Sequence, residues 1–197
     1  RNTSFQVGSI ITTTGFMTVD FDQWPSLSRY VLLFLMMIGA CAGSTGGGMK
    51  VSRFLLSVKS ALRELNSYLF PKSVKKIKMD GKTVDEEAIR GINVYFTAYI
   101  LLVVLSVFLI CINGMDIESA FSSVLGTFNN IGPGLGKFGP TCNFGWVSTF
   151  SKYVYIFDML AGRLELFPVL ILLYPPSWRG LLKRSMKRKK NKRATTI

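Results

Sequence analysis

The chain has 197 residues, 49% of them apolar, and its 24 Lys and Arg residues outnumber its 11 Asp and Glu residues to give a net charge of +13. The apolar residues come in long uninterrupted blocks, which indicates membrane-embedded helices rather than a single soluble core. The chain contains no His. Without His, and without carboxylates paired at a suitable spacing, the sequence offers no catalytic set, so we expect neither an enzyme nor a bound cofactor.

The basic residues are concentrated in two clusters, with ten of them between Lys50 and Arg90 and nine between Arg179 and Arg193. Both clusters adjoin apolar blocks, which is the pattern of cytoplasmic segments under the positive-inside rule. We therefore expect membrane lipid headgroups or an acidic protein face as their counterparts, and no nucleic acid.

A first unit is predicted over residues 1–65. It opens with a short helix-compatible stretch at residues 4–11, and an apolar segment at residues 30–42 follows a polar loop. Between them lies a tract of small polar residues that ends in glycine. This first tract consists of Thr12, Thr13, Thr14 and Gly15.

A glycine-rich run then interrupts the apolar segment, because each Gly costs a helix about 1 kcal/mol relative to Ala. Helical spacing of apolar residues resumes at residues 51–65. The run has two readings: a hinged gating loop inside the membrane, or a helix end with a Gly cap, which Lys50 also suits. Its members are Gly43, Ser44, Thr45, Gly46, Gly47 and Gly48.

Residues 66–90 are polar and rich in Lys, and we predict a cytoplasmic connection there, with a turn at Asp80 and a helix start at Asp85. An uncharged stretch follows, and a helix over residues 92–112 has roughly the length of the bilayer's hydrocarbon core. The pattern predicts one membrane-spanning helix that stops at Asn113.

A second unit, residues 91–176, repeats the order of the first. A short helix-compatible stretch at residues 119–127 precedes a second tract, and a long apolar segment follows at residues 148–174. The glycine run begins 28 residues after the end of the first tract, and Gly162 lies 30 residues after the end of the second. Residues 177–197 form a basic cytoplasmic tail, which either lies on lipid or docks a regulatory protein. The second tract consists of Asn129, Asn130, Ile131 and Gly132.

The two tracts are candidates for an ion-selectivity filter. A dehydrated K⁺ ion needs a cage of oxygen atoms, and the backbone carbonyls of an extended loop can form one where glycine permits unusual dihedral angles. Either tract alone is a weak signal and favours an ordinary turn, because Thr and Gly tracts are common. Two tracts at matching positions of a repeat, each ahead of a long apolar segment, favour the filter and place K⁺ at these eight residues.

Arg163 is a charge inside an apolar segment, where exposure to lipid would cost several kcal/mol. It must face either an aqueous path or a carboxylate, and Asp158 and Glu165 are the candidate partners. The two interpretations are a structural ion pair and a positive barrier in the path of a cation.

Together the first tract, the Gly-Ser-Thr-Gly-Gly-Gly-Met-Lys run, the Asn-Ile-Gly-Pro-Gly stretch and the Gly-Arg-Leu-Glu run resemble the TrkH branch of the Trk/Ktr/HKT potassium transporter superfamily. The resemblance implies an all-α membrane protein of four helix–pore-loop–helix repeats, with re-entrant pore helices and extended filter segments. This chain would hold the end of the third repeat and all of the fourth, preceded by two further repeats. Gly15 and Gly132 would be filter glycines, residues 43–48 the gating loop and Arg163 the pore arginine.

The same resemblance implies potassium uptake across the cytoplasmic membrane by a multi-pass, homodimeric subunit. It also implies a cytosolic, nucleotide-binding regulatory partner of the TrkA type. Two alternatives stay open: a sodium-permeable or less selective cation transporter of the same superfamily, and a membrane-anchored docking module without transport that uses its basic segments.

Overall fold

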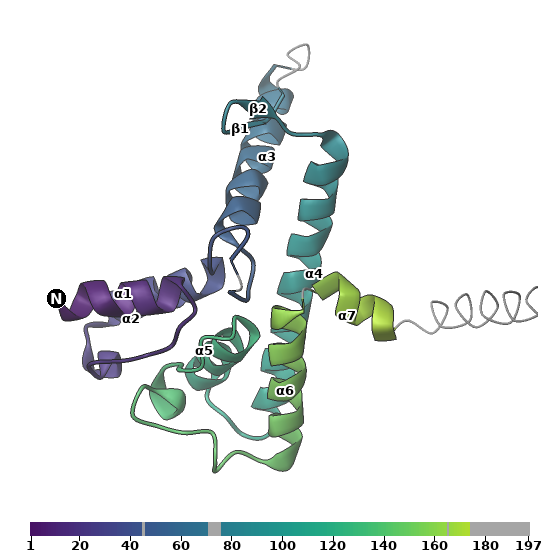
Figure 1. Ribbon diagram of the computed structural model, residues 1–197. Helices are drawn as coiled ribbons and strands as arrows, with labels where there is room; N and C mark the ends of the chain where they lie inside the picture. The colour runs from purple at the N-terminus through teal and green to yellow at the C-terminus, as the bar shows by residue number, and fades with distance from the viewer. Residues whose placement is uncertain (45, 71–75, 165, 174–197) are drawn as a thin grey trace, which may run out of the picture.

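A computed structural model describes residues 1–44, 46–70, 76–164 and 166–173 of the chain. These parts are mostly helical, and the predicted all-α class is confirmed apart from one two-residue hairpin (Figure 1). The elements in chain order are α1 (Asn2–Ile11), the 3₁₀ turn η1 (Phe21–Gln23), α2 (Ser26–Ile38), α3 (Val51–Leu69), β1 (Lys78–Met79), β2 (Lys82–Thr83), α4 (Glu86–Cys111), α5 (Ile117–Phe128), the 3₁₀ turn η2 (Gly136–Phe138), α6 (Thr149–Arg163) and α7 (Leu166–Leu173).

Helix α4 is the longest helix of the described residues, and α3, α5, α6 and α7 pack against it (Figure 1). Its N-cap is Asp85, and Glu86 and Glu87 in the first turn complement the positive end of the helix dipole. This is the start that the sequence indicates. Within the described residues it is the one helix long and apolar enough to cross a membrane, and only 28% of its most apolar window is buried. Most of that apolar surface therefore faces outward, as it does in a helix in contact with lipid.

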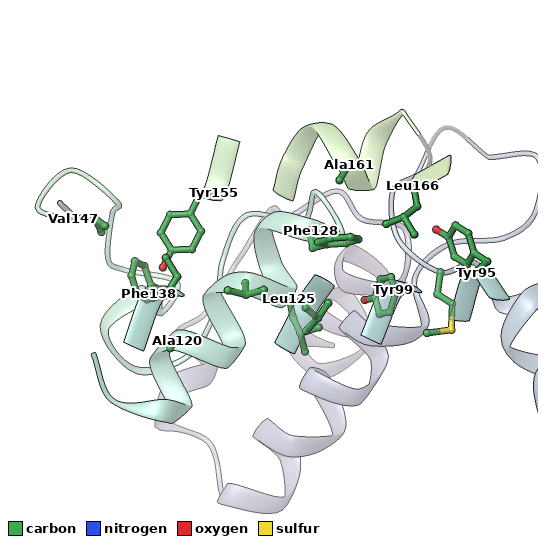
Figure 2. Packing of buried hydrophobic residues seen from close by; sticks show 14 residues of the cluster. Tyr95, Tyr99, Ala120, Leu125, Phe128, Phe138, Val147, Tyr155, Ala161 and Leu166 are labelled. Carbon is green, nitrogen blue, oxygen red and sulfur yellow. The ribbon is translucent and has the colours of Figure 1, made fainter. Parts of the chain in front are cut away.

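Helix α5 is short and lies within the protein, packed against α4 and α6. Its residues from Ser119 to Phe128 are buried apart from a half-buried Phe121. Three of these residues are serines, whose small side chains allow close approach of neighbouring helices. An apolar core joins α4, α5 and α6 around Leu125 and Phe128 (Figure 2). A short helix so enclosed has the form of a re-entrant pore helix.

The N-terminal half of α4 packs along α3, and the small hairpin lies at the same end of the pair (Figure 1). Asp80 and Gly81 both have positive φ, +50° and +79°, as a tight hairpin turn requires. The turn was predicted, but the strands were not. Ile77, next to β1, is buried with Leu56 and Ile89, and this contact attaches the hairpin to both helices.

Two breaks in the long apolar segments differ from the predictions. Helix α2 ends at Ile38, because Gly39 takes φ +73°, so the chain leaves the helix before the predicted break at Gly43. The second segment is not one helix: α6 ends at Arg163, and α7 leaves at an angle to it (Figure 1). Pro168 explains this break, because its ring excludes a helical contact with the carbonyl four residues earlier. The basic tail, residues 177–197, lies outside the described ranges.

Candidate functional site

The two predicted filter tracts lie side by side. A β-carbon built on Gly15 would overlap the carbonyl oxygen of Ile131, and it would also lie 3.4 Å from Cδ of Pro133. Gly15 has φ +76°, which L side chains rarely adopt. The backbones of the two tracts are therefore in direct contact at Gly15, and only glycine fits at this position.

The backbones of the two tracts have the same conformation. Thr12 and Asn129, the C-caps of α1 and α5, have φ/ψ of −81°/1° and −85°/2°. The next residues, Thr13 and Asn130, have φ +54° and +56°, although neither is glycine. Non-glycine residues with positive φ are uncommon. Finding them at matching positions, two residues before a positive-φ glycine in each tract, shows that one backbone design occurs twice.

Each tract folds its amide groups back onto the end of its helix. The tract N–H groups donate to carbonyls of the last helical turn, and the second set of bonds follows the first at a constant interval of 117 residues. The pairs are Thr12 N to Gly8 O and Asn129 N to Leu125 O, both 3.0 Å; Thr13 N to Ile10 O, 3.1 Å, and Asn130 N to Thr127 O, 3.0 Å; Thr14 N to Ser9 O, 2.9 Å, and Ile131 N to Gly126 O, 2.8 Å.

This bonding decides where the carbonyls point. In a planar trans peptide the C=O of one residue is opposed to the N–H of the next. Since the N–H groups of Thr13 and Thr14 point back to α1, the carbonyls of Thr12 and Thr13 point away from it, and the same holds for Asn129 and Asn130 at α5. The C-terminal ends of both helices, which carry partial negative charge, also point toward the tracts. The arrangement can attract and coordinate a cation.

Side chains hold the second tract from several directions. The Asn129 amide donates to Leu125 O at 3.0 Å, and its Oδ1 accepts a hydrogen bond from Tyr99 Oη of α4 at 3.2 Å. The Asn130 amide donates to Met159 O of α6 at 3.1 Å. The contacts with Tyr99 and Met159 were not predicted, because each joins residues about 30 positions apart. They fix the tract to two of the helices that surround it.

The glycine loop, defined here as residues 39–44 and 46–50 between α2 and α3, lies directly against both tracts. A β-carbon on Gly46 would lie 2.9 Å from Thr13 Oγ1, and one on Gly47 would lie 2.8 Å from Asn129 O. One on Gly48 would overlap the Asn129 side chain. The loop therefore closes one side of the pair of tracts, at a distance that only glycines permit.

The predicted gating residues do not all lie at this contact. Gly43 is exposed with nothing within 4 Å of its β-position, and the exposed Ser44 bonds to Cys41 O at 2.7 Å within the loop itself. Thr45 lies outside the described residues. The structure thus brings Gly46, Gly47 and Gly48 to the two predicted filter tracts and leaves Gly43 and Ser44 away from them.

Arg163 is exposed at the end of α6 and forms no ion pair with any residue of the described ranges. Asp158, one of its two predicted partners, is instead fully buried and accepts a hydrogen bond from Ser106 Oγ of α4 at 2.6 Å. An ion pair between Arg163 and Asp158 is therefore absent, and the other candidate, Glu165, lies outside the described residues. Gly162 packs so closely on α5 that its β-carbon would overlap Phe128 O.

A pair of ion pairs that was not predicted joins the two units at the N-terminal end of α5. Arg29 of α2 contacts both Asp22 of η1 and Glu118 of α5, each at 3.3 Å. Asp116 caps α5, and the hydrogen bond from the Ser119 N–H lowers the pKa of its carboxyl. Because Arg29 and Glu118 lie far apart in the sequence, local patterns could not have paired them.

Gly132, unlike Gly15, faces open space. Nothing in the described part of the chain lies within 4 Å of its β-position. A cavity of about 500 Å³ adjoins it, lined by Ile131 and Gly132 on one side and by residues of α6, including Tyr155 and Met159, on the other. The two tracts thus contact each other on one side, and the second tract is open on its other side.

Two pore helices, each followed by a carbonyl-directing tract, together with the long apolar helix α4, define a membrane cation-transport protein of the pore-loop type. The chain belongs to the TrkH family of cation transport proteins, whose family model matches residues 1–178.

Sequence and structure comparisons with individual proteins support the same family. The chain is 46% identical over 176 residues to the Trk system potassium uptake protein TrkH of Vibrio parahaemolyticus, and 42% identical over 175 residues to that of Escherichia coli K12. In both cases 89% of this chain matches 36% of the relative. The crystal structure of the potassium transporter TrkH from Vibrio parahaemolyticus superimposes with a TM-score of 0.80 at 45% identity, over 88% of this chain and 37% of that one. The chain therefore spans about a third of the length of these relatives.

Proposed function

We propose that this chain forms part of the pore through which K⁺ is taken up across the cytoplasmic membrane. K⁺ binds the carbonyl oxygens of residues 12–15 and 129–132, and residues 43–48 of the glycine loop gate the pore next to the filter. The observation that carries the proposal is the duplicated tract, with one backbone conformation and one hydrogen-bond pattern repeated at an interval of 117 residues and in direct contact at Gly15 and Ile131.

Two tracts do not surround an ion, and the open side of Gly132 supports a larger ring. Ile131 lies beside Gly15, but no residue of the described ranges lies beside Gly132 in the corresponding position. A further tract of the same design would fit there, against the cavity next to α6. The greater length of the relatives allows for two more such repeats.

The remaining assignments follow from the same family membership. The outward apolar face of α4 supports contact with lipid in a multi-pass membrane protein. The relatives carry the name of a Trk system, which supports assembly with other subunits. A homodimer with a cytosolic, nucleotide-binding regulatory protein of the TrkA type is the assembly we propose. Arg163 lines the cation path as a positive barrier, supported by its exposure and by the missing ion pair with Asp158.

The test is flux. The complete gene product that contains these residues should restore growth at low K⁺ to a host that lacks its own K⁺ uptake, and Rb⁺ uptake into these cells should be saturable. Uptake of Na⁺ equal to that of K⁺ would indicate the less selective transporter instead. Failure to restore growth, with the protein shown to be inserted in the membrane, would favour a docking module.

A further inference from the structure

Two tyrosines one turn apart on α4 link the filter, the glycine loop and the helices beyond it. Tyr95 and Tyr99 are separated by four residues, which places them on one face of the helix. Their exposed fractions are 4% and 1%. Figure 2 shows both rings pointing into the same core, Tyr99 beside Phe128 and Tyr95 nearer Leu166.

Tyr99 contacts the filter. Its hydroxyl donates to Asn129 Oδ1 at 3.2 Å, and its ring meets the edge of Phe128 at 5.0 Å between centroids. The Asn129 side chain is fully buried, so its amide needs both of its partners, Tyr99 and Leu125 O. Asn129 begins the second tract, and Tyr99 thereby sets the orientation of the residue from which the carbonyl ladder starts.

Tyr95 contacts the glycine loop and two helices. Its hydroxyl donates to Gly48 O at 3.4 Å, its ring accepts the Arg53 guanidinium of α3 at 4.3 Å, and its edge meets Phe167 of α7 at 5.8 Å. The loop, α3 and α7 therefore converge on one side chain. If the loop, α3 or α7 moves away from α4, it breaks a contact with Tyr95.

We propose that the two tyrosines are positioning residues with separate tasks, Tyr99 setting ion selectivity through Asn129 and Tyr95 holding the glycine loop against the filter. This inference rests on the proposed function. Loop and filter also touch each other at Gly48 and Asn129, so the two tasks are carried by neighbouring contacts on one helix. A pull on α3 or α7 from the cytoplasmic side would reach the loop through Tyr95.

The conservative variants separate the two tasks. Tyr99→Phe keeps the ring and leaves Asn129 Oδ1 without its donor, so we expect the ratio of K⁺ to Na⁺ uptake to fall several-fold. Tyr95→Phe keeps both ring contacts and removes the bond to the loop. Loss of one hydrogen bond shifts a two-state equilibrium by roughly two- to tenfold, so we expect a rise of that order in uptake per molecule, with the ion ratio unchanged.

The measurement is Rb⁺ and Na⁺ uptake by the complete gene product in cells without their own K⁺ uptake, divided by the amount of protein in the membrane. Tyr153→Phe, on the 69% exposed Tyr153 of α6, is the matched control and should change neither quantity. A destabilised fold would lower uptake of both ions together. The inference is overturned if the wild type transports but Tyr99→Phe keeps its ion ratio, or if Tyr95→Phe lowers or does not change uptake. A wild type without uptake would instead refute the proposed function.

Discussion

The carbonyl oxygen of Ile131 occupies the space that a β-carbon on Gly15 would need. The two residues are more than a hundred positions apart and belong to different units of the repeat. Their contact is therefore the structural link between the two tracts, and it explains why glycine is required in the first tract even apart from its backbone angle.

Replacing Gly15 by Ala tests the contact itself. The methyl group would overlap Ile131 O and would also stand at a φ of +76°, where a non-glycine residue costs about 1 to 3 kcal/mol. We expect a clear fall in the ratio of K⁺ to Na⁺ uptake. Gly8→Ala in α1 is the matched control: nothing lies within 4 Å of its β-position, and Ala favours a helix, so selectivity should be kept. Equal selectivity in both variants would argue against the filter assignment.

Replacing Arg163 by Ala tests the positive barrier. The side chain is exposed and has no ion-pair partner in the described ranges, so its loss should cost little stability. Removing a positive charge from the cation path should raise the maximal rate of Rb⁺ uptake, and Arg163→Lys, which keeps the charge, should stay near the wild type. If the Ala variant fails to accumulate in the membrane, Arg163 has a structural role, and the barrier is refuted.

Replacing Gly162 by Ala tests the packing of α6 on the pore helix. The added methyl group would overlap Phe128 O, and overpacking of this kind costs about 1 to 3 kcal/mol. We expect a lower melting temperature for the purified protein in detergent. Gly91→Ala in α4, where nothing lies within 4 Å, serves as the control and should melt no lower than the wild type. A Gly162→Ala protein as stable as that control would mean that α6 lies farther from α5.

The N-cap of α5 carries a pH dependence. Hydrogen bonding from the Ser119 N–H lowers the pKa of Asp116, so its stabilisation is present above the ordinary Asp pKa of about 3.9 and is lost as the pH falls through the lower, folded-state value. Asp116→Ala should lower stability at pH 7 by about 0.5 to 1 kcal/mol, and Asp116→Asn, which still caps, by less.

Melting temperatures at pH 7 and pH 3.5 check this expectation. The difference between Asp116→Ala and wild type should shrink at the lower pH, because pH 3.5 lies below the ordinary Asp pKa and protonation of this carboxyl then favours the unfolded state. An Asp116→Ala protein that melts like the wild type at pH 7 would show that the cap contributes nothing.

The predictable and unpredictable parts of this fold differ in how far apart the interacting residues lie. The start of α4 at Asp85 and the two tracts could be read from the sequence, because acidic first turns and glycine positions act locally. The end of α2 at Gly39 was misplaced, since Ala40, Cys41 and Ala42 continue the apolar pattern beyond it.

Long-range contacts were outside the reach of local patterns. The hydrogen bond between Tyr99 and Asn129 and the ion pair between Arg29 and Glu118 depend on how the helices pack. A Tyr or an Arg in the sequence does not indicate which distant residue it will contact. The break between α6 and α7 is a different case, because Pro168 was visible in the sequence and its effect on the preceding turn is a general one.

The most direct test of the filter is the position of the ion itself. Crystals of the complete gene product should be grown in, or soaked with, Rb⁺ or Tl⁺, and their anomalous density should locate the ion. We expect the ion to be coordinated by backbone carbonyl oxygens of both tracts, residues 12–15 and residues 129–132. Density confined to other sites, with these carbonyls facing protein or lipid, would contradict the account.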